Sequence, residues 1–437
     1  MPEASSNAIV SGPSTPLVPR QTLLPFLLLT SCFAWWGLAN NMTDTLLSAF
    51  KRIMSMTDFQ TSWIQIAFYG SYFCLALPAA ILIKRFTYKS GVLLGLGLFL
   101  IGSLLFYPAS RTMNYFHFLI ALYILAGGLS ILETSCNPYI IAMGPEETGT
   151  RRLNLAQSFN PIGSIAGVVL SKWFILSKLD RATAQERAAM SPEQLQQIQA
   201  GELGAVMGPY VGVALILAAL WVMIALSKMP RASEAGGALN LGKTFRRLIR
   251  NRNYVWGVVA QFFYVGAQIG VWSFTIRYVM QELTLNEEQA SSYYLAALVL
   301  FTISRFACTG LMRFLKPGGL LAALSFVAIA FTLTAIYGGG YIAVYALVGI
   351  SGCMSLMFPT IFGLAVRGLG EDTKIGGSGL IMAILGGAVL TAAQGQVSDA
   401  TGSIHLSYWV PLSCFGVIAY YGLVACRRDL RQSSLAK

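Results

Sequence analysis

Two carboxyl groups stand inside long apolar stretches of this sequence. Asp44 lies late in the apolar segment 22–50, and Glu133 lies in the middle of the apolar segment 115–143. An acid at the centre of a bilayer costs roughly 3 kcal/mol on insertion scales, so it normally faces a partner or a wet cavity. Burial disfavours the charged form of a carboxyl group, so either residue could hold a proton near neutral pH and release it to water. Reversible protonation is therefore the chemistry that these acids offer, although Asp44 could instead cap the outer end of its helix.

Amide and indole side chains accompany the two acids at helical spacing. Asn40 and Asp44 are four residues apart, as are Glu133 and Asn137, so each pair shares a helical face. An unsatisfied buried amide costs roughly 1 to 3 kcal/mol and needs a partner. Contacts between helices would satisfy such amides, but together with the acids they favour a sugar pocket, where aromatic faces cover the C–H side of the ring. The candidates in this part of the chain are Trp36, Asn40, Asn41, Asn137, Asn154, Gln157 and Asn160.

A second polar stripe is expected on the segment 254–281. Gln261, Tyr264, Gln268 and Trp272 recur every three or four residues, so they fall on one side of a helix. We expect this side to line the same cavity. Arg305, in a later apolar segment, could pair with an acid or a substrate oxygen, or could extend to the membrane interface.

The remaining reactive residue types do not form an enzyme site. The sequence has no nucleotide-binding loop, metal-ligand spacing or nucleophile elbow, and His117 and His405 lie near the ends of apolar segments. We therefore predict no enzyme activity and no cofactor, with a proton as the coupling ion. The seven cysteines are scattered singly and are interpreted as small packing residues: Cys32, Cys74, Cys136, Cys308, Cys353, Cys414 and Cys426.

The elements that must position these groups are membrane-spanning helices. Of the 437 residues, 55% are hydrophobic and only 11% are charged, whereas soluble domains carry roughly 25% charged residues. The apolar blocks are long enough to cross about 30 Å of hydrocarbon as helices, and the short alternating segments of a β-barrel are absent. We predict an all-α membrane protein with twelve helices at 22–50, 61–83, 90–110, 115–143, 153–177, 208–228, 254–281, 289–314, 317–338, 341–367, 375–398 and 407–426.

The distribution of basic residues predicts the orientation and the domain organisation. With both termini in the cytoplasm, 21 of the 30 Lys and Arg residues fall in inner loops and tails and eight in outer loops, as the positive-inside rule requires. This explains the net charge of +12 without nucleic acid as a partner. We expect a disordered cytoplasmic tail over 1–20, a six-helix bundle over 21–228, a cytoplasmic linker over 229–252, a second six-helix bundle over 253–427 and a cytoplasmic tail over 428–437.

The two halves of the chain repeat one another at a nearly constant offset. Arg85 and Lys89 in the loop after the second helix correspond to Arg313 and Lys316 after the eighth, and Glu146-Glu147-Thr148 corresponds to Glu371-Asp372-Thr373, 225 residues later. Matches in equivalent loops and in the same order indicate two parallel six-helix repeats around a central cavity. In the linker, we interpret the basic stretch 243–252 as a helix on anionic lipid headgroups rather than a protein-binding site.

Six motifs resemble the major facilitator superfamily and, within it, the sugar permeases related to the bacterial L-fucose:proton symporter. They span nearly the whole chain, although Lys84-Arg85 stands where the superfamily usually has an acid followed by a base. The motifs are WGLANNMTD at 36–44, LETSCNP at 132–138, RLNLAQSFN at 152–160, AQFFYVGAQ at 260–268 followed by Trp272, FPTIF at 358–362 and GEDTK at 370–374. In that family, acids at the positions of Asp44 and Glu133 are linked to proton coupling and sugar recognition.

The resemblance implies a secondary transporter of the bacterial inner membrane that takes up a monosaccharide, favouring L-fucose, by proton symport through alternating access. Its partners would be the sugar, the proton and the lipid bilayer, and we expect a monomer. A glucose or galactose carrier, or a facilitator without ion coupling, stays open. A sugar sensor is disfavoured, because it would require a signalling domain.

Overall fold

The computed structural model describes residues 16–53, 58–112, 114–174, 186–187, 190–230 and 240–435. This part of the chain is helical and contains no β-strand, as predicted for an all-α protein. The helices are α1 (Leu23–Ile53), α2 (Asp58–Arg85), α3 (Tyr88–Thr112), α4 (Tyr115–Ala142), α5 (Gly149–Gln157), α6 (Asn160–Phe174), α8 (Pro192–Leu226), α9 (Leu241–Arg250), α10 (Arg252–Leu283), α11 (Glu287–Leu311), α12 (Pro317–Tyr337), α13 (Gly340–Met354), α14 (Met357–Val366), α15 (Thr373–Met382), α16 (Gly386–Thr401), α17 (Ile404–Ser407) and α18 (Trp409–Leu435).

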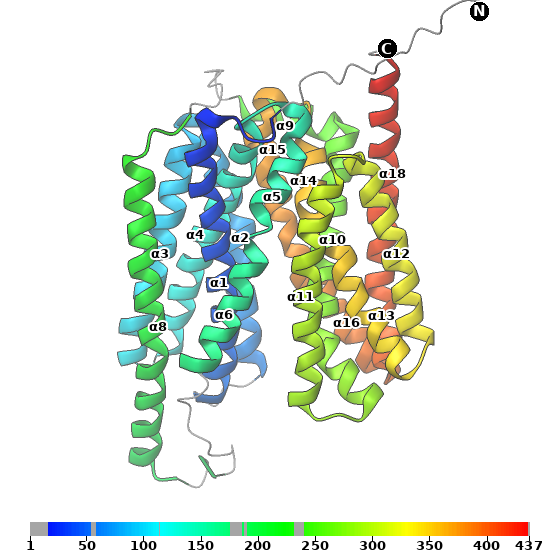
Figure 1. Cartoon of the computed structure of the whole chain (residues 1–437). Helices are drawn as coiled ribbons and strands as arrows, with labels where there is room; N and C mark the ends of the chain where they lie inside the picture. The colour runs from blue at the N-terminus through cyan, green and yellow to red at the C-terminus, as the bar shows by residue number, and fades with distance from the viewer. Residues whose placement is uncertain are drawn as a thin grey trace, which may run out of the picture.

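The helices form two groups that stand side by side (Figure 1). Helices α1 to α8 make up the first half and α10 to α18 the second, while α5, α14 and α15 lie between the groups near the top of the view. The start of α1 and the end of α18 are at this same end, which we call the terminal side. Eleven segments of the described chain are long and apolar enough to cross a membrane, and α5 with α6 supplies the twelfth crossing.

Three of the twelve predicted spans are interrupted rather than continuous. The span predicted at 153–177 is divided into α5 and α6, that at 341–367 into α13 and α14, and that at 375–398 into α15, the 3₁₀ turn Ala383–Leu385 and α16. Two of these breaks come just before a proline, Pro161 and Pro359. A proline lacks the N–H that a helix needs and its ring crowds the carbonyl four residues earlier, which explains the interruption.

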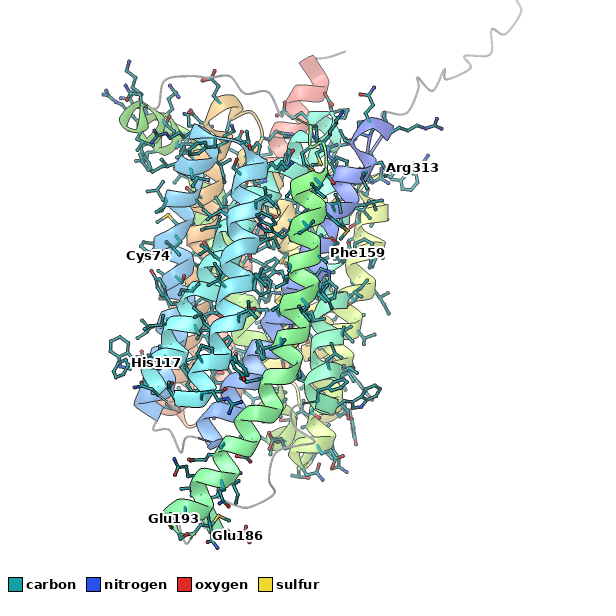
Figure 2. All side chains as sticks on the ribbon, turned by 90° about the vertical axis from the view of Figure 1, so that its left-hand side faces the viewer. Cys74, His117, Phe159, Glu186, Glu193 and Arg313 are labelled. Atoms are coloured by element: carbon teal, nitrogen blue, oxygen red, sulfur yellow. The ribbon has the colours of Figure 1, made fainter. Side chains whose placement is uncertain are left out.

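Helix α8 begins 16 residues before the predicted start at 208. The added part, which begins at Pro192, is rich in glutamine and contains Glu193 and Glu202, so the apolar block used to predict the helix did not include it. Ser191 and Gln194 form a capping box that starts the helix there. Arg187 also pairs with Glu202 on this extension, with 2.9 Å between Nη1 and Oε2, and both side chains are buried. Figure 2 shows Glu193 at the end of the molecule opposite to Arg313.

The predicted internal repeat is visible in local structure. Glu146–Thr148 and Gly370–Asp372 both fold as 3₁₀ turns, and each is followed directly by a helix, α5 or α15. The break between α5 and α6 at Ser158, moved by the same 225 residues, falls on the turn that begins at Ala383. Equivalent positions in the two halves therefore start and interrupt a helix in the same way.

The two halves contact each other from the centre of the molecule to the terminal side. Asn154 Nδ2 of α5 donates to Thr360 Oγ1 of α14 at 3.1 Å. Nearer the loops, the backbone N–H of Gly368 donates to Glu146 Oε1 at 2.9 Å. Gly363 also comes close to the first half, because a Cβ atom placed on it would lie only 3.0 Å from Thr150 Cβ. The halves are therefore in direct contact on this side.

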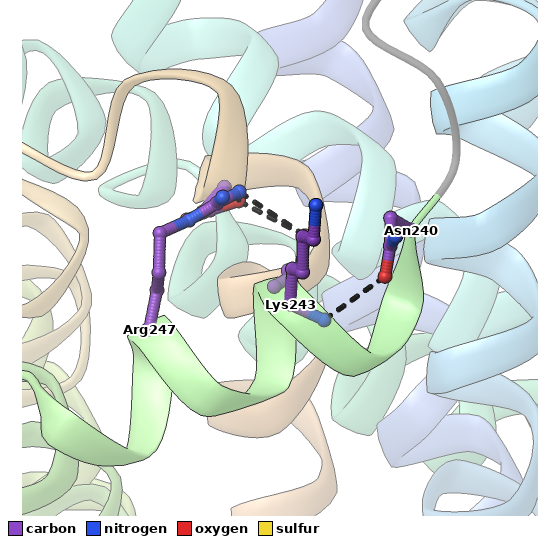
Figure 3. A network of polar contacts seen from close by, with 5 residues as sticks. Asn240, Lys243 and Arg247 are labelled. Atoms are coloured by element: carbon purple, nitrogen blue, oxygen red, sulfur yellow. Dashed lines mark hydrogen bonds and ion pairs between the residues drawn. The ribbon is translucent and has the colours of Figure 1, made fainter.

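Helix α9 lies in the linker and is attached to the second half. Asn240 starts it by accepting a hydrogen bond from the Lys243 N–H at 3.1 Å (Figure 3). Arg247 then donates from Nε and Nη2 to the two oxygens of Asp372, each at 2.6 Å, and the Thr244 hydroxyl adds a third bond to this carboxylate at 3.1 Å. The Asp372 carboxylate raises the pKa of the Arg247 guanidinium, chiefly through this hydrogen bonding. The linker is thus fixed to the turn that precedes α15.

We expect that cysteines placed at Thr150 and Gly363 will form a disulfide between the halves. The present separation of 3.0 Å between the Cβ positions needs to widen only slightly to reach about 3.8 Å, the usual value for a disulfide. In a chain carrying a protease site within the linker 231–239, the oxidised and cleaved double variant should migrate as one species without reductant and as two with it. Each single-cysteine variant is the control, and two species under oxidising conditions would show that the halves do not meet here.

Candidate functional site

A cavity of about 150 Å³ lies between the two halves. Pockets for drug-sized ligands measure roughly 300–1,000 Å³, so this cavity suits a smaller solute. Eight helices and the turn before α16 contribute to its wall, and aromatic and amide side chains dominate it. The lining residues are Trp36, Gly37, Asn40, Asn41, Phe68, Tyr69, Tyr72, Glu133, Gln157, Asn160, Pro161, Ser164, Val265, Gln268, Ile269, Trp272, Leu298, Phe301, Arg305, Phe358 and Ile384.

Close packing of α1 on α6 places the first group of polar residues. A Cβ atom on Gly37 would collide with the Asn160 carbonyl, and one on Gly163 would collide with the Ala34 carbonyl. Only glycine permits this approach of two backbones. Asn160 Nδ2 donates back to the Phe33 carbonyl at 3.3 Å, so the crossing also fixes the orientation of an amide that lines the cavity.

Glu133 is the acid that the described side chains bring to the cavity. It is 2% exposed, and its Oε1 accepts a hydrogen bond from the Tyr72 hydroxyl at 3.3 Å. Its Oε2 has no hydrogen-bond partner within the described part of the chain. A buried carboxyl group with one free oxygen can hold a proton or bind a ligand hydroxyl. Asp44 lies on α1, but its side chain is outside the described residues.

Asn137, behind the cavity wall, forms a second polar pair with Gln157. Gln157 Nε2 donates to Asn137 Oδ1 at 2.8 Å, and both side chains are buried. Asn137 Nδ2 has no hydrogen-bond partner among the described residues. This amide orients Gln157, which lines the cavity, and retains an unused donor near Glu133, one turn earlier on α4.

The predicted stripe on α10 reaches the cavity only in its second part. Gln268 and Trp272 line it, and Trp272 Nε1 donates to Ser351 Oγ at 3.2 Å. Gln261 and Tyr264 are fully buried, and the Tyr264 hydroxyl donates to the Met354 carbonyl at 3.2 Å. They share the side of α10 but lie one to two turns nearer the terminal side, at about 1.5 Å per residue. At that level α14 packs against α10.

The other predicted residues also divide into some that line the cavity and some that lie outside its wall. Trp36, Asn40, Asn41 and Asn160 line the cavity with Gln157, whereas Asn154 joins α5 to α14 outside the cavity wall. Sequence reasoning missed three aromatic groups of α2 that also line it: Phe68, Tyr69 and Tyr72. The signal was available, because Tyr69 and Tyr72 follow helical spacing with Phe68 beside them in an otherwise apolar segment.

Arg305 is buried at 4% exposure and connects the two halves at the wall of the cavity. Its Nη1 donates to the Gln157 carbonyl at 3.0 Å, and its Nε donates to the Ser355 carbonyl. Pro161 and Pro359 stand four residues after these carbonyls, so neither carbonyl can accept the usual helical hydrogen bond. The guanidinium also lies over the Phe301 ring at 4.6 Å, a cation–π contact. Arg305 therefore does not extend to the interface, and it pairs with backbone rather than with an acid.

The sequence matches the Major Facilitator Superfamily over residues 26–393. It is 40% identical over 405 residues to the L-fucose-proton symporter of Escherichia coli, covering 91% of this chain and 92% of that protein. The L-fucose-proton symporter of Haemophilus influenzae is 38% identical, with 94% and 98% covered. The glucose/galactose transporter of Brucella abortus is 35% identical over 401 residues, with 91% and 93% covered.

Solved structures give the same result for the fold. A crystal structure of a Major Facilitator Superfamily transporter, FucP, in the outward conformation superposes with a TM-score of 0.88 at 40% identity, and the match covers 93% of this chain and 99% of that one. The proton:xylose symporter XylE superposes with a TM-score of 0.63 at 13% identity, over 91% and 94% of the two chains. At that identity the second match supports the fold alone.

Replacing Arg305 with Met should lower the thermal stability of the purified protein. The change keeps a long side chain but leaves the Gln157 and Ser355 carbonyls unpaired, and each hydrogen bond to a charged group is worth about 1.5–3 kcal/mol. A fall of several degrees in the melting temperature in detergent is expected. Arg313→Met is the matched control, because Arg313 is exposed near the end of the same helix. Equal melting temperatures for the two variants would show that the Gln157 and Ser355 carbonyls do not need Arg305.

Proposed function

This chain belongs to the Major Facilitator Superfamily, and from that premise we propose that it takes up L-fucose with a proton by alternating access. The observation that carries the proposal is Glu133, a buried carboxyl group with one free oxygen in the wall of a small cavity between the halves. Two L-fucose-proton symporters at 38% and 40% identity support the choice of substrate.

The proposed binding site combines the cavity with the polar residues behind it. Amides and Glu133 Oε2 would bind the sugar hydroxyls, and the faces of Trp36 and Trp272 would cover the C–H side of the ring. Asn154, Gln261 and Tyr264 would act from behind the wall, by holding α5 and α10 in place. The full set proposed for substrate is Trp36, Asn40, Asn41, Asn137, Asn154, Gln157, Asn160, Gln261, Tyr264, Gln268 and Trp272.

Proton coupling follows from the cost of closing the cavity over a charge. An ionised Glu133 requires water or a cationic partner, because an unpaired buried charge is very costly. A proton removes that cost, and the bound sugar then supplies contacts in the closed state that the empty protein lacks. A ligand shifts a conformational equilibrium only by such a difference in affinity. Asp44 is the second proposed proton site, from the resemblance alone.

The described structure is assigned to the outward-facing state in this proposal. The halves meet on the terminal side, and the positive-inside rule favours the cytoplasm for the side that carries the basic loops. The chain would be a monomer in a bacterial inner membrane, with the segments 21–228 and 253–427 as its two rocking units, the segments 1–20, 229–252 and 428–437 in the cytoplasm, and no cofactor or enzyme activity. A disulfide between cysteines at positions 150 and 363 would hold this state and stop transport until it is reduced.

Uptake by proteoliposomes tests the substrate and the coupling ion together. We expect labelled L-fucose to accumulate when an inward proton gradient is imposed, and an excess of unlabelled D-glucose, D-galactose or D-arabinose to compete poorly. The 35% identity to a glucose/galactose transporter makes D-glucose and D-galactose the main alternative substrates. Strong competition by either sugar would therefore replace L-fucose as the proposed substrate. Equilibration without accumulation would identify an uncoupled facilitator.

Glu133→Gln should abolish proton-driven accumulation of L-fucose. The amide keeps the shape and can still accept from Tyr72, but it cannot release a proton. Exchange of labelled for unlabelled sugar should persist, because exchange needs no net proton movement. Asp44→Asn is also expected to lose accumulation, and Glu287→Gln, an exposed acid at the start of α11, serves as the control. If the double variant Glu133→Gln/Asp44→Asn still concentrates sugar, neither acid carries the coupling proton.

A further inference from the structure

Helix α9 presents three different faces, and only one of them is occupied by the protein. Thr244 and Leu248, one turn apart, are buried against the second half. Phe245 and Ile249, also one turn apart, are 38% and 71% exposed. Exposed apolar residues on a short helix that is fixed to a membrane protein need an apolar surrounding.

The third face of α9 is basic and exposed. Lys243, Arg246 and Arg250 lie on it, and Arg252 follows at the start of α10. None of these four side chains forms an ion pair within the part of the chain that the structure describes. Their positive charge lies beside the exposed apolar residues on the same helix. This combination of an apolar face and a basic face is typical of helices that lie in the headgroup region of anionic membranes.

Two aromatic residues mark the depth of the bilayer surface next to α9. Trp256, one turn into α10, is 38% exposed and packs on Tyr420 of α18, which is 49% exposed, with 4.9 Å between ring centroids. Trp and Tyr concentrate where the hydrocarbon meets the headgroups. Only five residues, 251–255, lie between the end of α9 at Arg250 and Trp256. The helix therefore lies at the level of lipid phosphates.

We propose that α9 is a binding surface for anionic phospholipids. Phe245 and Ile249 enter the upper acyl region, and Lys243, Arg246 and Arg250 bind the phosphates beside it. A soluble acidic protein would match the basic face, but it would leave Phe245 and Ile249 without an apolar surrounding at the edge of the bilayer. The lipid surface satisfies both faces at once. The proposal requires that the chain spans a membrane and does not depend on which solute it carries.

The same helix connects this surface to the contact between the halves. Arg247 holds Asp372, and Lys374, two residues further on, reaches the first half, where its Nζ lies 5.0 Å from the centre of the Tyr88 ring. Lipid bound on α9 therefore restrains the start of α15, which packs on α2 and α4. Anionic lipid should favour the state in which the terminal side is closed.

A label at residue 249 tests the lipid surface directly. Ile249→Cys is spin-labelled in a chain whose Cys74, Cys308 and Cys426 are replaced by Ser, and the full-length protein is reconstituted in phosphatidylcholine vesicles with or without phosphatidylglycerol. We expect phosphatidylglycerol to shield the label from a water-soluble relaxation agent and expose it to oxygen. Each basic residue near an anionic surface contributes about fivefold in affinity, so K243Q/R246Q/R250Q should remove most of the effect.

The matched control removes three exposed charges elsewhere on the terminal side. R20Q/R313Q/R427Q should keep the phosphatidylglycerol effect on the label. It should also keep the yield of the disulfide between cysteines at positions 150 and 363, which reports contact between the halves on the terminal side. Shielding that is the same in both lipids, or that survives K243Q/R246Q/R250Q, would overturn the proposal. So would a label that becomes shielded only when soluble cell protein is added. No readout here requires transport, so these results stand apart from those on L-fucose uptake.

Discussion

One buried guanidinium satisfies two carbonyls that prolines have removed from the helical hydrogen-bond pattern. Pro161 leaves the Gln157 carbonyl without a donor in the first half, and Pro359 does the same to Ser355 in the second. Arg305 donates to both. Unpaired buried carbonyls cost roughly 1 to 3 kcal/mol each, so either break would be costly alone. Because one side chain serves both breaks, the two interruptions and the contact between the halves stabilise one another.

This arrangement also determines where the cavity wall can form. The interruption at residue 158 separates α5 from α6, so Gln157 and Asn160, on either side of it, both line the cavity. Glycines at the crossing of α1 and α6 then bring Trp36 and Asn40 to the same space. The polar groups that face a ligand thus depend on backbone features more than on their own side-chain interactions.

Sequence patterns predicted the number of spans, their approximate limits, the internal repeat and the burial of Glu133, because hydropathy and the cost of a buried acid act locally. They did not predict which prolines interrupt a helix. Pro78, Pro108 and Pro138 lie inside continuous helices, whereas Pro161 and Pro359 follow breaks. At both breaks the carbonyl left without its helical donor is bound by Arg305, which is distant in sequence from both carbonyls. The helical period likewise placed Gln261 and Tyr264 on the correct side of α10. It could not show that α14, which is distant in sequence, covers this part of the helix.

The choice of acceptors for Arg305 bears on how easily the halves can separate. Had Arg305 paired with a buried carboxylate, removing that partner would cost about 3–5 kcal/mol. Its acceptors are instead neutral carbonyls, and the Phe301 ring on its own helix stays with it when the halves move. Opening the terminal side must break the bond to Gln157 but can leave the bond to Ser355, which belongs to the same half as Arg305. The pairing is therefore strong enough to stabilise the closed contact and weak enough for the binding energy of a small solute to release it.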